Sequence, residues 1–139
     1  MHSSRIERCC KHYCRNYFDI RRSCRRIIEI NDADGAVTLP TITAATIGAK
    51  YTFFVGTDAT DLDIKTDGTD KFVGSVSVAG TTTKAFAPAA SNDVISMNGG
   101  TTGGDAGSYV EATALATAEY LVQGVLVGSG SVATPFADS

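Results

Sequence analysis

The sequence contains no tryptophan, three prolines and two histidines, and none of its four cysteines lies beyond residue 24 of 139. These cysteines are Cys9, Cys10, Cys14 and Cys24. Cysteines spread through a chain predict a disulfide framework, so their clustering excludes one for residues 27–139. Both histidines, His2 and His12, lie in the same early segment, which leaves the rest of the chain without the commonest general base. No apolar run approaches the roughly 20 residues that span a membrane, and no apolar stretch near the start indicates a secretory signal. We expect a soluble protein without a membrane partner.

Charge divides the chain at residue 26. Residues 1–26 carry eight Lys or Arg against two acidic residues, a net charge of +6, whereas residues 27–139 carry four Lys against thirteen acidic residues, a net charge of −9. The first segment also lacks Gly, Ala, Val and Thr, from which the remainder is largely built. We predict a basic, cysteine-containing N-terminal arm over residues 1–26 and one domain over residues 27–139. The acidic domain argues against nucleic acid as the main partner, because phosphate binding needs clustered Lys and Arg.

The arm allows more than one interpretation. Residues 1–26 are either an arm with a function of its own or a start region that the native reading of the gene does not encode. Cys10 and Cys14 have the spacing of half a zinc site, but Cys24 has no partner nearby, so reduced thiols are favoured over a metal site. The basic pairs at residues 21–22 and 25–26 suit an acidic surface or nucleic acid about as well as a solvated tail.

Short apolar alternations punctuated by Gly, Pro and Asp-Gly predict eight to ten strands and no helix after residue 26. Residues 35–56 show the pattern most fully, with a strand ending at Pro40, a loop of small residues, and a second strand. In that second strand Tyr51, Phe53 and Val55 share one face, and we predict that Phe53 is buried. Many short strands of this kind favour an all-β fold, either a small antiparallel β-sandwich or a compact barrel.

Turn residues predict how these strands connect. Asp-Gly at residues 34–35 predicts a hairpin between residues 26–31 and 36–40. Residues 71–78 are predicted to form a single strand. Five aspartates between residues 58 and 70 do not match calcium-loop spacing, so we interpret them as solvated turns and predict no metal. Residues 99–108 hold five glycines but no phosphate-loop lysine, which favours a flexible surface hairpin. The tail at residues 129–139 is expected to pack on a neighbour or to fray.

Residues 119–128 form a predicted strand that is apolar on both faces. One face carries Leu121, Val125 and Val127, and the other carries Tyr120, Val122 and Leu126. A thin sandwich buries one face of this strand in its own core. If the other face is exposed to solvent, it forms an apolar surface patch. We therefore predict a homo-oligomer, with a trimer favoured. The candidate subunit interface comprises Tyr120, Val122, Val125 and Leu126.

Three segments together resemble a known class of proteins. They are GAVTLP followed by an Ala/Thr-rich linker and GAKYTFFVG at residues 35–56, the acidic LDIKTDGTDKFVGSVSV at residues 62–78, and YLVQGVLVGSG at residues 120–130. This order is similar to that of small structural proteins of tailed bacteriophages, especially marine and cyanobacterial phages. The resemblance covers roughly residues 27–139, leaves the arm unmatched, and contains no invariant chemical motif.

The resemblance implies a capsid cement (decoration) protein on the virion surface. Such a protein binds the outer face of the head, contacts the major capsid protein and acts as a clamp without catalysis. The alternative is a tail-fibre or receptor-binding module of the same virion. An enzyme or carbohydrate-binding module is a third class, disfavoured because the carboxylates cluster in turns and tryptophan is absent. We expect no enzymatic activity, no catalytic residues and no cofactor.

Overall fold

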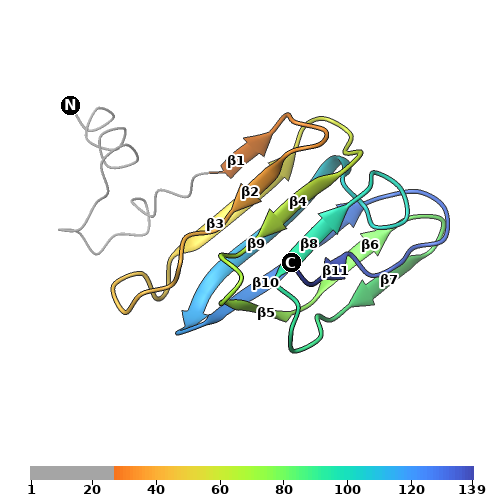
Figure 1. Cartoon of the computed structure of the whole chain (residues 1–139). Helices are drawn as coiled ribbons and strands as arrows, with labels where there is room; N and C mark the ends of the chain where they lie inside the picture. The colour runs from red at the N-terminus through yellow and green to blue at the C-terminus, as the bar shows by residue number, and fades with distance from the viewer. Residues whose placement is uncertain (1–26) are drawn as a thin grey trace, which may run out of the picture.

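The computed structural model of the chain describes residues 27–139, which form eleven β-strands and no helix. Figure 1 shows their arrangement in space. The strands are β1 (Ile27–Ile30), β2 (Ala36–Thr38), β3 (Lys50–Val55), β4 (Leu62–Lys65), β5 (Lys71–Gly74), β6 (Val76–Ala79), β7 (Thr83–Phe86), β8 (Val94–Met97), β9 (Asp105–Ala116), β10 (Glu119–Val127) and β11 (Phe136–Ala137).

The larger of two sheets has seven strands. Six of them follow the order β1-β3-β9-β10-β6-β7, and β5 pairs with β10 beside β6. The hairpin of β9 and β10 is the centre of this sheet, since β3 pairs with β9 on one side while β5 and β6 pair with β10 on the other. Both long strands alternate buried and more exposed residues over most of their length, in β9 from Ser108 to Leu115, which is the pattern of a sheet covered on one face.

The smaller sheet has four strands in the order β11-β8-β4-β2 and lies across the larger one (Figure 1). Residues of both sheets form one hydrophobic core, including Phe53 and Val122 from the large sheet and Leu62 and Ile95 from the small one. The predicted all-β class is confirmed, and because the two layers do not close into a barrel, the sandwich is the one of the two predicted architectures that the chain adopts. The sheets are mixed rather than purely antiparallel, because four of the nine strand pairings between residues 27 and 139 are parallel.

The predicted hairpin between residues 26–31 and 36–40 is wrong. Strands form at both places, but β1 pairs in parallel with β3 of the large sheet, and β2 pairs in parallel with β4 of the small one. The connection crosses between the layers and is held by the carbonyl of Ala33, which accepts hydrogen bonds from the amides of Thr60 and Asp61. The Asp-Gly pair at residues 34–35 correctly indicated a turn. This turn connects strands of two different sheets rather than the two strands of a hairpin.

The single strand predicted at residues 71–78 is two strands, β5 and β6, which lie along the same side of β10. Gly74 ends the first with φ of +102°, a conformation that side chains other than glycine rarely adopt. A Cβ atom there would also lie 2.4 Å from the carbonyl oxygen of Val122. The break therefore occurs where the chain approaches β10 too closely for a side chain.

Two segments expected at the surface are instead packed within the domain. In the glycine-rich loop, Gly103 and Gly104 are buried, and the carbonyl of Gly104 accepts a hydrogen bond from the amide of Ala59. The C-terminal tail forms β11 against β8, and Phe136 packs beside Phe72 with ring centroids 6.3 Å apart. The tail thus completes the core of its own chain.

Candidate functional site

The four residues predicted as a subunit interface lie on opposite faces of the large sheet. Tyr120, Val122 and Leu126 point into the sandwich and are at most 1 % exposed, so they belong to the internal core rather than to an accessible surface. The hydroxyl of Tyr120 donates a hydrogen bond to the carbonyl of Pro40, and burial raises the pKa of this hydroxyl to about 12. Of the four residues, Val125 alone lies on the outer face, partly exposed.

The outer face of the large sheet, which the small sheet does not cover, carries two adjacent rows of side chains across β3, β9 and β10. Strand register aligns Phe54 with Tyr109 and Tyr109 with Val125 in the first row. The second row aligns Glu111 with Thr52 on β3 and with Gln123 on β10. Neighbours in such rows lie about 5 Å apart, close enough for their side chains to interact.

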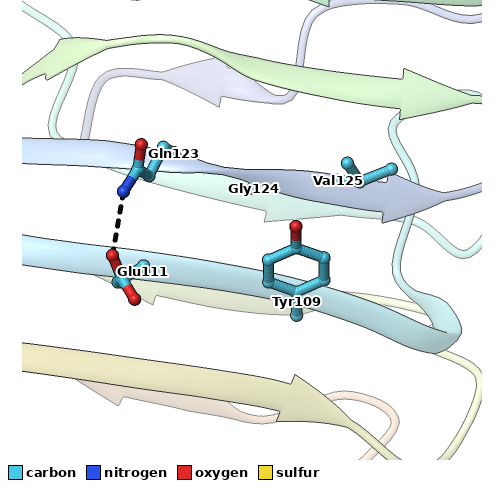
Figure 2. A pocket seen from close by; sticks show the side chains of 5 residues that line it. All are labelled: Tyr109, Glu111, Gln123, Gly124 and Val125. Atoms are coloured by element: carbon cyan, nitrogen blue, oxygen red, sulfur yellow. Dashed lines mark hydrogen bonds between the residues drawn. The ribbon is translucent and has the colours of Figure 1, made fainter.

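A shallow, open depression lies between these rows, with a volume of about 330 Å³. It is lined by Tyr109, Glu111, Gln123, Gly124 and Val125 (Figure 2). In this view the Tyr109 ring is seen nearly face-on, and its hydroxyl is directed towards β10 beside Val125. The residue is 47 % exposed, and its ring is open to an incoming ligand from the outer face.

The polar side of the depression is built around Glu111. The side-chain amide of Gln123 donates a hydrogen bond of 2.8 Å to the Glu111 carboxylate, and the ammonium of Lys50 lies 3.2 Å from the same oxygen. Both contacts come from flanking strands, so the carboxylate is held in place from two sides. The Lys50 charge offsets that of Glu111, which leaves a polar edge with little net charge.

Gly124 allows β9 and β10 to approach closely at the depression. A Cβ atom at this position would lie 2.2 Å from the carbonyl oxygen of Tyr109, a backbone atom that cannot move aside without disturbing the ladder. The register of the two strands also shifts between Val125 and Val127, which marks an irregularity next to the depression. The site is therefore framed by paired backbone rather than by a loop.

The aspartates of residues 58–70 serve mainly to fix loops. The Asp67 carboxylate accepts hydrogen bonds from the Thr41 hydroxyl and from two backbone amides, and these bonds lower its pKa to about 2. Asp70 is 3 % exposed and accepts a hydrogen bond from the amide of Ile42, so it is not the solvated turn residue expected from the sequence. The carboxylate of Asp58 accepts a hydrogen bond from the amide of Ala106. Burial and the nearby charge of Asp58 raise the pKa of Asp105.

A second buried carboxylate, Asp93, joins three parts of the sandwich. Its oxygens receive the Lys71 ammonium at 2.8 Å and both the amide and hydroxyl of Ser139. Burial by itself would raise the pKa of Asp93, but the hydrogen bonds from Lys71 and Ser139 and the Lys71 charge outweigh it and lower that pKa. This arrangement secures the chain end to β5 and β8 and accounts for the ordered tail. Among residues 27–139 no group of three or more His, Cys, Asp or Glu side chains is placed to hold a metal ion.

The cysteines and basic pairs singled out in the arm lie outside the described residues. The sequence prediction also missed Tyr109, Glu111 and Gln123 as a group. One signal was present: alternation places Tyr109 and Glu111 on the same face. Counting back from the Glu119–Ala116 pair would bring Gln123 opposite Ala112, and it is the register shift between Glu119 and Tyr120 that brings Gln123 opposite Glu111. Adding Gln123 to the group therefore requires knowing both that the two strands pair as a hairpin and that their register shifts.

The depression offers an aromatic face, a carboxylate, an amide and a nearby ammonium. Such groups can stack on a ligand and can accept or donate hydrogen bonds to it. Glycan hydrolysis commonly uses two carboxyl groups facing each other, whereas Glu111 is the single carboxylate among the residues that line this depression.

Comparison with known proteins returns no match. No protein-family model fits the chain, and no curated protein or solved structure resembles it significantly. Between residues 27 and 139, no helix has the length and apolar character needed to cross a membrane.

Proposed function

We propose that this protein is a non-catalytic structural component of a tailed-bacteriophage virion, namely a capsid cement protein. It would bind the outer surface of the head and connect neighbouring copies of the major capsid protein. The proposal rests first on the sequence resemblance over residues 27–139, which includes all eleven strands of the described part of the chain.

The observation that favours a clamp is the distribution of exposed apolar side chains. Ile47 and Leu115, 47 % and 48 % exposed, lie together at one end of the domain, where the amide of Gly48 bonds the carbonyl of Ala114. Ile27 and Ile28, 63 % and 36 % exposed, lie on β1, the outermost strand of the large sheet in its described part. Two separate apolar contact areas suit a protein that bridges two neighbours. Many weak copies on a repeating lattice then strengthen it collectively.

A homo-oligomer, with a trimer favoured, belongs to the same proposal. The inner face of β10 is buried in the core and cannot contact another subunit. The two apolar contact areas are therefore the better candidates for the subunit interface. The acidic domain makes a protein surface a more suitable partner than nucleic acid.

The test measures how many copies each particle carries. Gel densitometry of purified virions should give a copy number that scales with the major capsid protein, and immunogold labelling should decorate heads. The double change Ile47→Asp with Leu115→Asp should lower head occupancy while the domain stays folded. A matched control, Thr82→Asp, changes an exposed loop residue away from both contact areas and should bind normally.

The alternative is a tail-fibre or receptor-binding module. The open aromatic depression favours it, because a receptor-binding module needs a ligand site that faces solvent. A few copies per particle, with labelling confined to tails, would replace the cement proposal with this one.

A further inference from the structure

We propose that the outer-face depression binds one ring of an uncharged sugar, such as the terminal residue of a surface glycan. This inference rests on the depression itself and holds whether the protein sits on a head or on a tail. Four features support it: the orientation of Tyr109, the polar groups beside it, the size of the depression and the rigidity of its frame.

The first feature is the aromatic platform. A pyranose has two faces of C–H groups and a rim of hydroxyls, so it packs on an exposed aromatic ring while its rim makes hydrogen bonds. Tyr109 presents such a ring nearly parallel to the sheet, and Val125 extends the apolar surface beside its hydroxyl (Figure 2). Tyrosine suits this task because it combines an apolar body with a polar tip.

The second feature is the polar edge formed by Glu111 and Gln123, with Lys50 paired to Glu111 from β3 but outside the lining of the depression. Sugar hydroxyls both donate and accept hydrogen bonds, and this edge supplies a carboxylate that accepts and an amide with both capacities. Because the amide nitrogen of Gln123 is directed to Glu111, its oxygen points away from that contact (Figure 2). The ion pair of Lys50 with Glu111 leaves little net charge, which favours a neutral sugar over an acidic or cationic ligand.

The third feature is size. A volume of about 330 Å³ lies at the lower end of the range of small-molecule sites, about 300–1,000 Å³. One sugar ring occupies such a space. The open rim lets the remainder of a glycan chain continue into solvent, so a terminal or branch residue would be recognised.

The fourth feature is preorganisation. All five lining residues belong to β9 and β10, which pair through most of their length. Glu111 is already held by two contacts before any ligand arrives. Sites on strands are more precise than sites on loops, and little ordering is required on binding. Dissociation constants for one ring are expected on the order of 1 mM, in keeping with so small and open a contact.

The experiment uses the full chain and three named probes: the methyl glycosides of glucose, galactose and mannose. Saturation-transfer difference NMR should show transfer from the protein to at least one of them. Tyr109→Ala should weaken binding at least about tenfold, since it removes the stacking surface. Gln123→Ala should weaken it less and serves as the second variant if Tyr109→Ala fails to fold.

Lys84→Ala is the control. Lys84 is an exposed residue of β7 in the same sheet, and it lies outside the depression and outside both apolar contact areas. It should bind the sugar as the wild type does. Because the assay needs no virion, its failure would leave the cement proposal standing, and loss of head occupancy would leave sugar binding unaffected.

Two results would overturn the proposal. One is the lack of transfer to all three probes, or equal transfer in the wild type and in both Tyr109→Ala and Gln123→Ala. The other is a sedimentation experiment in which the wild type is an oligomer that Tyr109→Ala dissociates, which would make a second copy of the chain the occupant of this face.

Discussion

The inner and outer faces of the large sheet are built from the same strands, yet they differ in almost every side chain. On the inner face Phe53 and Val122 are 2 % and 0 % exposed, while their sequence neighbours Phe54 and Gln123 lie on the exposed outer face. The inner face is apolar apart from the buried Ser108 at one end of β9. On the outer face, the Glu111–Gln123 pair separates the apolar residues. Apolar content on both sides of a strand therefore does not show that both sides require cover.

The largest expected effect comes from placing a charge on each face of β10. Val122→Lys should destabilise the domain by more than about 4 kcal/mol, because it buries an unpaired ammonium in the core. Val125→Lys places the same charge on the partly exposed outer face and should cost about 1 kcal/mol or less. Circular dichroism during urea unfolding would measure both.

The two lysine variants also test self-association through the outer face. If Val125→Lys stays folded but loses mass in sedimentation, that face is covered by another copy. Equal stability of Val122→Lys and the wild type would mean that the inner face has been assigned incorrectly.

A smaller effect is expected from truncating two adjacent aromatic residues on β3. Phe53→Ala should lower the free energy of unfolding by about 3 to 5 kcal/mol, since it leaves a cavity among core side chains. Phe54→Ala should lower it by less than about 1 kcal/mol, because that ring is 38 % exposed. Thermal or urea unfolding of both proteins gives the comparison directly, and similar losses would contradict the assignment of the two faces.

The inner face was predictable because it depends on local alternation. Tyr51, Phe53 and Val55 were assigned to one face from spacing, and Phe53 and Val55 are buried in the core. Strand pairing was not predictable in the same way, because it is set by contacts between distant residues. Ile28 and Ile30 alternate as a hairpin strand would, but their parallel partner is β3, more than twenty residues away.

The candidate site was harder to foresee than the core. Tyr109, Glu111 and Gln123 form a group through the register of β9 with β10, and a shift between Glu119 and Tyr120 sets that register. No local spacing reports such an irregularity. The buried aspartates were missed for a related reason, since Asp93 finds its partners in Lys71 and the distant Ser139.

An intermediate effect, dependent on pH, is expected from Asp93 at the junction of the two sheets. Its pKa is lowered from the usual 3.8, so its ionised form stabilises the fold. That contribution is fully present above the unfolded pKa of about 3.9 and is lost as the pH falls through the lower folded value. Asp93→Asn should cost about 1 to 3 kcal/mol at neutral pH.

The pH dependence separates the charge of Asp93 from its packing. The difference in unfolding free energy between Asp93→Asn and the wild type should be constant from pH 7 to about 5 and should shrink as the pH falls below about 4. Urea unfolding across this range measures it. A difference that stays constant at low pH would show that the carboxylate charge contributes little.

The smallest expected effect comes from the ion pair on the outer face. Glu111→Gln preserves the shape of the side chain but removes its attraction to Lys50, whose side chain is 37 % exposed. Exposed pairs of this kind stabilise a fold by about 0 to 1 kcal/mol, and salt screens them. We therefore expect a loss of less than about 1 kcal/mol in low salt that disappears near 1 M salt, measured by urea unfolding at both ionic strengths. A loss as large as that of Asp93→Asn, unchanged by salt, would mean that the outer face is shielded from water and is covered in solution.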